Sequence, residues 1–91
     1  MNKNELIKKV ADRSDCSVRQ ATFVINQALE EIQNAVADGE TVSLAGFGSF
    51  VLKTREARQG RNPATGEMIE IAASKSPAFK PAKAFKDKVN G

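Results

Sequence analysis

Residues 46–66 constrain the fold of this chain more than any other stretch. The stretch opens with Gly46-Phe47-Gly48-Ser49-Phe50, an apolar run whose glycines suit a strand that starts at a tight connection. It closes with Gly60-Arg61-Asn62-Pro63-Ala64-Thr65-Gly66, where Asn-Pro and Thr-Gly are both turn signals. The basic residues Lys53, Arg55 and Arg58 lie between them. So basic a segment cannot be a hydrophobic core, and we predict a ribbon of two strands that leaves the body of the domain midway.

The N-terminal half has the spacing of two helices. Asn2 and Glu5 stand three apart, as in a capping box, ahead of a helix over about residues 3–13. Ser17 and Gln20 form a second box, and apolar residues then recur at helical spacing over about 18–38. Gly39 follows as the expected left-handed residue after the helix.

Beyond Gly39 the apolar period changes from helical to alternating. We predict a strand over 41–44, a long strand over about 47–58, a tip over 60–66, a return strand over about 67–76 and a helix over about 82–89 with Pro81 at its N1 position. The fold class is therefore α+β: two N-terminal helices, a three-stranded antiparallel sheet with a long β-ribbon arm, and a short C-terminal helix. We expect a single domain over 1–91, with a body of about 1–52 and 77–91 and an arm of about 53–76.

The size of the chain favours an oligomer. A chain of 91 residues buries too little surface to build a large core by itself. With one cysteine and no histidine, neither a disulfide framework nor a Cys/His zinc site is available to stabilise it. We therefore predict an intertwined dimer, a homodimer first and a heterodimer with a paralogue second. Its shared core is predicted to contain Leu29, Ile32, Val36, Phe47, Phe50 and Phe79.

The net charge of +3 is distributed unevenly. Residues 1–45 hold five Lys/Arg against seven Asp/Glu, whereas residues 46–91 hold nine against four. This asymmetry indicates a polyanionic partner, with nucleic acid first and an anionic membrane surface second. An enzyme is disfavoured, because the chain has no histidine, no paired acids and no Gly-rich phosphate loop. We expect no cofactor and no metal, and we interpret Cys16 as a small filler residue.

The candidate binding residues follow from this charge. Strand alternation places Lys53, Arg55 and Arg61 on one face of the arm and Arg58 on the other, and a twist or a bulge could still bring all four to one groove. Pro63 is either a simple turn former or an apolar wedge between base pairs, with Asn62 seating the tip. A further set of lysines either contacts phosphates or is ordinary surface charge: Lys3, Lys75, Lys80, Lys83 and Lys86.

The runs that begin at Gly46 and Gly60 together resemble the signature of the HU / integration host factor family of bacterial DNA-bending proteins, and the resemblance covers essentially the whole chain. It implies a homodimer that binds double-stranded DNA, above all bent, nicked or gapped DNA, through two arms in the minor groove. It also implies that Pro63 kinks the DNA, that sequence preference is low, and that the protein is cytoplasmic and organises the nucleoid.

Two alternatives stay open beside this resemblance. An integration-host-factor-like subunit would form a heterodimer and prefer certain sites, partly through the deformability of DNA. From a different class, an interaction module could use the arm to bind acidic proteins or anionic membrane, although a folded ribbon with a proline tip argues against a membrane helix. RNA is a possible secondary partner.

Overall fold

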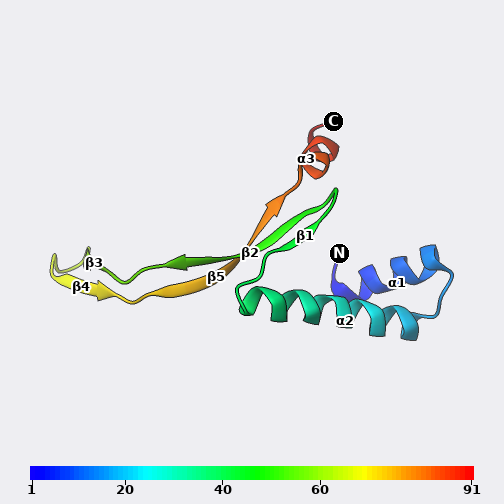
Figure 1. Ribbon diagram of the computed structural model, residues 1–91, viewed down its shortest axis with the longest axis horizontal. Coiled ribbons are helices and arrows are strands. Elements are labelled where there is room, and N and C mark those ends of the chain that lie inside the picture. The colour runs from blue at the N-terminus through cyan, green and yellow to red at the C-terminus, as the bar shows by residue number, and fades with distance from the viewer. The chain divides into compact units, whose positions relative to one another are not determined.

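The computed structural model describes residues 1–91 and consists of two compact units, Met1–Asn34 and Ala35–Gly91. The predicted fold class is confirmed: two N-terminal helices, antiparallel sheet, ribbon arm and C-terminal helix (Figure 1). In chain order the elements are α1 (Lys3–Ser14), α2 (Val18–Ala37), β1 (Val42–Leu44), β2 (Gly48–Arg55), β3 (Arg58–Arg61), β4 (Met68–Ile71), β5 (Ser74–Pro81) and α3 (Lys83–Asn90).

Local capping explains where α1 and α2 begin. The Asn2 side chain accepts a hydrogen bond from the Glu5 amide at 2.9 Å, which makes Asn2 the N-cap of α1. At α2 the box is reciprocal: Ser17 Oγ accepts from the Gln20 amide at 3.0 Å, and Gln20 Oε1 accepts from the Ser17 amide at 3.2 Å. Both predicted helix starts are confirmed.

The end of α2 is a Schellman motif. Gly39 has a φ of +89°, and its amide donates to the Val36 carbonyl at 2.9 Å. The Glu40 amide donates to the Ala35 carbonyl at 2.9 Å. These two bonds satisfy carbonyls that the helix leaves without partners, and the left-handed backbone at Gly39 allows both to form.

Replacing Ser17 with alanine is expected to lower the free energy of unfolding by about 1 kcal/mol, the usual loss when an N-cap hydroxyl is removed. Urea unfolding followed by circular dichroism measures the change. Gln27→Ala is a suitable control, because Gln27 is exposed in the middle of α2. Equal stability of the Ser17→Ala variant and the wild type would mean that the box does not hold the start of α2.

The core of the first unit is small. Ile7 and Ala11 of α1 pack with Ala21 of α2, and Cys16 and Ile25 lie against this cluster. The packing of Cys16 agrees with its interpretation as a filler residue.

No helix is both long enough and apolar enough to cross a membrane.

In the second unit, β1, β2 and β5 form an antiparallel sheet in that order. Between β1 and β2 the chain turns tightly through Gly46, whose φ is +79°, and the Phe47 amide donates to the Leu44 carbonyl at 3.0 Å. The strand over 41–44 and the tight connection after it are therefore confirmed. The α3 helix follows β5 after an N-cap, Ala82, that offers no side-chain hydrogen bond.

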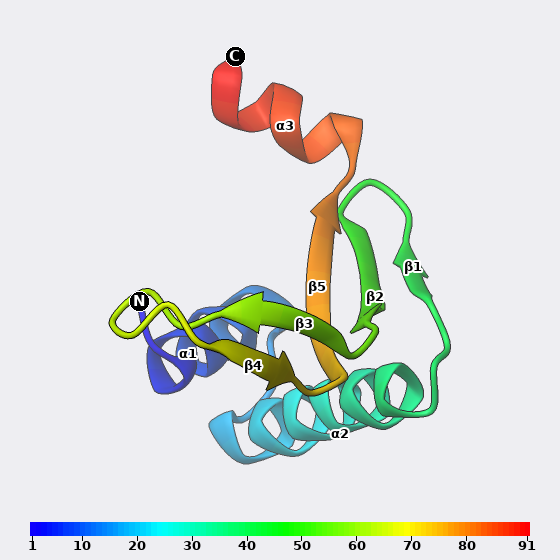
Figure 2. The same ribbon diagram turned by 90° about the vertical axis from the view of Figure 1, so that its left-hand side faces the viewer.

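The prediction of one long outgoing strand over 47–58 is wrong in one respect, because the structure has two strands there, β2 and β3. Pairing stops after Arg55 and resumes at Arg58, and on the return side it stops after Ile71 and resumes at Ser74. The interruption therefore covers two residues on each strand, 56–57 and 72–73. Their side chains are one glutamate and three alanines, types that are depleted in strands. In Figure 2, β3 and β4 run across the direction of β2 and β5.

Two further boundaries differ from the predictions. The tip is shorter than 60–66, because Gly60 and Arg61 still pair with β4, opposite Ile69 and Met68. Pro81 is not the N1 residue of the last helix: it ends β5 opposite Gly48, and α3 begins at Lys83. Pro81 can lie in this strand because the sheet has β5 at its edge, where a missing N–H is tolerated.

Candidate nucleic-acid interface

The register between β2 and β5 gives this part of the sheet two chemically different faces. Phe50 pairs with Phe79, and Leu52 pairs with Pro77, so this face is apolar. The neighbouring pair, Ser49 with Lys80, lies on the opposite face. Because side chains alternate along a strand, Lys53 and Arg55 share the face of Lys80, whereas Lys75, opposite Thr54, shares the apolar face. The sheet thus has one face with Lys53, Arg55 and Lys80, and another with the phenylalanines and Lys75.

The distal ribbon, β3 and β4, continues the arm beyond the interruption. Arg61 lies opposite Met68, on the face that also holds Gln59 and Glu70. Arg58 lies opposite Ile71, on the other face with Gly60 and Ile69. Arg58 and Arg61 therefore point to opposite faces, as the alternation predicts. The four basic residues singled out on the outgoing side of the arm are all exposed: Lys53, Arg55, Arg58 and Arg61.

The tip turn is organised around Asn62. Its amide donates to the Glu67 carbonyl at 2.7 Å, and its carbonyl accepts from the Gly66 amide at 2.7 Å. Its side-chain Oδ1 accepts from the Ala64 amide at 2.9 Å. Gly66 has a φ of +74°, a conformation that glycine adopts without a steric penalty. Pro63 lies between Asn62 and Ala64 and is exposed at the apex.

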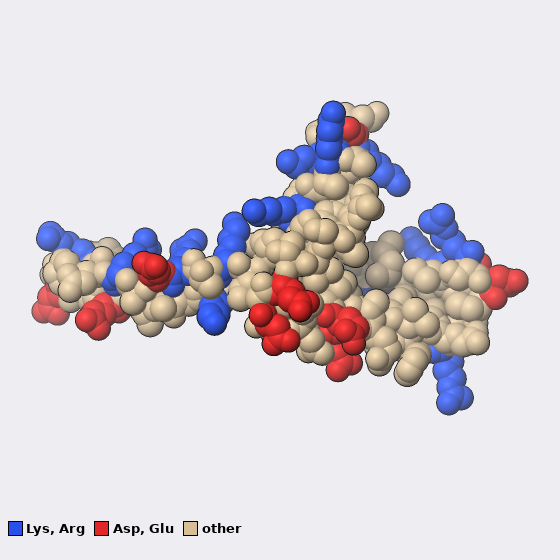
Figure 3. Space-filling model, in the orientation of Figure 1, with Lys and Arg blue, Asp and Glu red and all other residues tan.

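The remaining predicted lysines fall into three places. Lys75 and Lys80 belong to β5, on opposite faces of it. Lys83 and Lys86 are three residues apart in the first turns of α3, so they lie on one side of that helix. Lys3 is the first residue of α1 and belongs to the other unit. Figure 3 shows basic side chains along the arm and around α3. No cluster of three or more His, Cys, Asp or Glu side chains could hold a metal ion.

Four phenylalanines meet in the second unit. Phe79 lies 5.1 Å from Phe47 and 5.0 Å from Phe50, measured between ring centroids. Phe85 of α3 stacks on Phe47 at 5.4 Å. Phe85 was missed by the sequence analysis, although an aromatic residue in an otherwise lysine-rich helix was a usable signal. The cluster joins α3 to the sheet, together with the hydrogen bond that the Ala82 amide donates to the Phe47 carbonyl at 2.9 Å.

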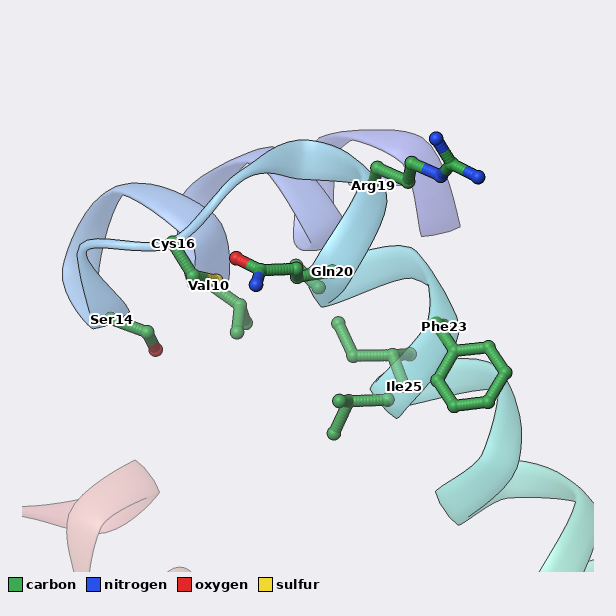
Figure 4. A pocket seen from close by; sticks show the side chains of 9 residues that line it. Val10, Ser14, Cys16, Arg19, Gln20, Phe23 and Ile25 are labelled. Carbon is green, nitrogen blue, oxygen red and sulfur yellow. The ribbon is translucent and has the colours of Figure 1, made fainter.

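An apolar groove opens beside the core of the first unit (Figure 4). Val10 of α1, Cys16 of the connecting loop and Val24 of α2 are among the residues that line it. The Arg19 side chain points away from the groove in Figure 4. The groove contains one free thiol, at Cys16, and no constellation of catalytic groups.

A small α+β chain with an exposed basic ribbon and a proline at the apex of that ribbon defines a class of protein, the β-ribbon DNA binders. The chain belongs to the family described as Bacterial DNA-binding protein, which it matches over residues 1–90. It is 52% identical over 91 residues to DNA-binding protein HU 1 of Bacillus subtilis strain 168, with 100% of this chain and 99% of that protein covered. It is 51% identical over 89 residues to DNA-binding protein HU of Staphylococcus aureus strain COL, covering 98% and 99%.

The solved structures agree with this assignment. An Anabaena HU–DNA cocrystal structure matches with a TM-score of 0.86 at 48% identity, covering 98% of this chain and 97% of that one. HU from Thermotoga maritima matches with a TM-score of 0.69 at 34% identity, covering 98% of each chain.

Proposed function

We propose that this chain is a histone-like DNA-binding protein that organises the bacterial nucleoid from the cytoplasm, and that it is not an enzyme. The observation that supports this function best is the arm, where exposed arginines follow one another along a ribbon that ends at Pro63. Family membership adds to it, since the relatives are named DNA-binding protein HU. The HU names also favour an HU-like protein over an integration-host-factor-like subunit.

The active form in this proposal is a homodimer with the two chains intertwined. Only four hydrophobic side chains are buried in the single chain, those of Ile7, Ala11, Ala21 and Val36. Phe47 is 44% exposed and Phe79 38%, although both belong to the aromatic cluster, and Leu29 is 44% exposed. Large apolar surfaces of this kind are normally covered in a stable assembly. A second copy would cover Leu29, Phe47 and Phe79, and it would place a second arm on the same particle.

Each arm would bind in the minor groove of double-stranded DNA. Arginine suits the narrow, negative minor groove, and Lys53 and Arg55 would contact phosphates nearer the body. Pro63 would enter a base step at the kink, where the loss of stacking is offset by the larger surface that bent DNA presents. Lys3, Lys75, Lys80, Lys83 and Lys86 would hold the flanking duplex. The minor-groove pattern is degenerate, so sequence preference is expected to be low.

A salt series on two duplexes of the same sequence tests the proposal, one duplex intact and the other nicked or gapped at its centre. The flexible duplex is expected to bind more tightly, because less free energy is needed to bend it. Both affinities should fall steeply with salt, with a slope of about −0.9 for each phosphate contact.

Equal affinity for the two duplexes would contradict bending as the main energetic event, and would favour a site-preferring protein. A shallow salt slope on both would contradict the arm as a phosphate-binding element. Preferential binding to anionic vesicles or to RNA in the same buffer would overturn duplex DNA as the principal partner.

A further inference from the structure

We infer that Asn62 is a positioning residue: its side chain holds the tip turn in the conformation that presents Pro63, and it affects DNA bending through that turn. The inference rests on the proposed role of Pro63. This role differs from a direct DNA contact by Asn62. It needs only the acceptor oxygen Oδ1, and the bond that this oxygen accepts is within the protein.

The hydrogen bonds of the tip support this inference. Three of them involve Asn62: its amide bonds the Glu67 carbonyl, its carbonyl bonds the Gly66 amide, and its Oδ1 bonds the Ala64 amide. All three enclose Pro63, but the Oδ1 bond closes the smallest loop, from residue 62 to residue 64, and Pro63 is the only residue inside that loop. Asn62 is also half-buried in a tip whose other residues are exposed.

The chemistry of the Asn62-Pro63-Ala64 segment explains why the side chain is needed. Pro63 has no N–H, so the backbone between residues 62 and 64 cannot be fixed by a bond from residue 63. An asparagine side chain that accepts from the amide two residues on forms an Asx turn, which mimics a backbone turn. The pyrrolidine ring is then held at the apex, with its apolar edge free.

Thr65 adds a weaker contact of the same kind. Its Oγ1 accepts from the Glu67 amide at 3.3 Å, across Gly66. The turn thus has a local side-chain acceptor on each side of its apex. The Oδ1 contact is the shorter of the two and lies next to Pro63, so Asn62 is the residue on which the presentation of Pro63 should depend.

The experiment compares four variants of the full chain with the wild type: Asn62→Ala, Asn62→Ser, Pro63→Ala and the double variant Asn62→Ala/Pro63→Ala. Bending of a doubly labelled duplex is measured by energy transfer, and exchange of the Ala64 amide is measured by NMR in the free protein. Serine is the matched control, since its hydroxyl can accept the same bond without adding charge.

Asn62→Ala is expected to speed exchange of the Ala64 amide roughly fivefold, the effect of losing one neutral hydrogen bond. Asn62→Ala should also lose most of the bending that Pro63→Ala loses. Asn62→Ser should recover most of both. In the double variant, bending should equal that of Pro63→Ala, because a residue that acts through Pro63 has no effect once Pro63 is gone.

Additive loss of bending in the double variant would overturn the inference and assign Asn62 a DNA contact of its own. Failure of Asn62→Ser to recover either property would overturn it as well. Wild-type bending by Pro63→Ala would overturn the wedge role in the proposed function. In that case, unchanged exchange of the Ala64 amide in Asn62→Ala would also remove Asn62 as an organiser of the tip.

Discussion

Replacing Gly48 with alanine is expected to lower the free energy of unfolding by about 3 kcal/mol, at the upper end of the usual effect of overpacking. Gly48 is buried at the start of β2 and pairs with Pro81. A Cβ atom there would lie 2.6 Å from the Lys80 carbonyl oxygen and 2.6 Å from Cζ of Phe79. The carbonyl belongs to the backbone of the neighbouring strand, so it can move only if the pairing of β2 and β5 is disturbed.

Gly46→Ala is the matched control for this substitution. Both glycines have a positive φ, +157° at Gly48 and +79° at Gly46, but at Gly46 no atom beyond its two chain neighbours lies within 4 Å of the position of an added Cβ. Its replacement should therefore have only the cost of the left-handed backbone, about 1 kcal/mol. Urea unfolding of both variants at equal protein concentration measures the difference. Equal loss in the two variants would mean that the close approach of β5 at Gly48 adds nothing to the requirement for glycine.

Replacing Arg55, Arg58 and Arg61 together with alanine is expected to weaken DNA binding by about a hundredfold at 0.1 M salt, with a salt slope shallower by about one unit for each arginine lost. All three side chains are exposed on the arm, and none belongs to the buried core. The fold should therefore be retained, and circular dichroism and the unfolding midpoint check that it is. Titration of a labelled duplex at several salt concentrations gives the affinity and the slope.

A variant with Lys8, Lys9 and Arg13 replaced by alanine separates local contact from net charge. These three residues are exposed on α1, and their loss changes the net charge by the same amount. It should bind DNA nearly as the wild type does and keep most of its salt slope. If both triple variants weaken binding equally, the effect belongs to overall charge, and the arm has no special part in it.

The features that could be predicted from the sequence are those determined within a few residues. The Ser17 and Gln20 box and the helix end at Gly39 need only neighbours along the chain, and both form as predicted. The interruption of the arm and the position of Pro81 depend on the pairing with the facing strand. Alternation along a single strand contains no information about that pairing. The same holds for the site: its basic residues were visible, but their distribution over two faces required the register.

Asn62 illustrates the same limit at the tip. Its position beside a proline marks a turn in the sequence, and its Oδ1 bond to the Ala64 amide is local, but the bond from its own amide to the Glu67 carbonyl forms only when the return side of the turn is in place. Phe85 was missed for a related reason. A single aromatic residue in a short basic helix acquires its role from the stacking partner, Phe47, which lies far away in the sequence.

The interruption at residues 56–57 and 72–73 has a geometric consequence. Arg55 faces Ser74 and Arg58 faces Ile71, so each strand skips the same number of residues and the register continues unchanged. The length of chain from the sheet to the apex is therefore fixed. At the interruption no ladder hydrogen bonds hold the two strands together, so the ribbon can bend there more easily than elsewhere. Such an arm has a constant length, whereas the direction of its distal ribbon can vary. In the proposed complex, the ribbon would follow minor grooves of different path and width while its apex stays at the same contour distance from the sheet.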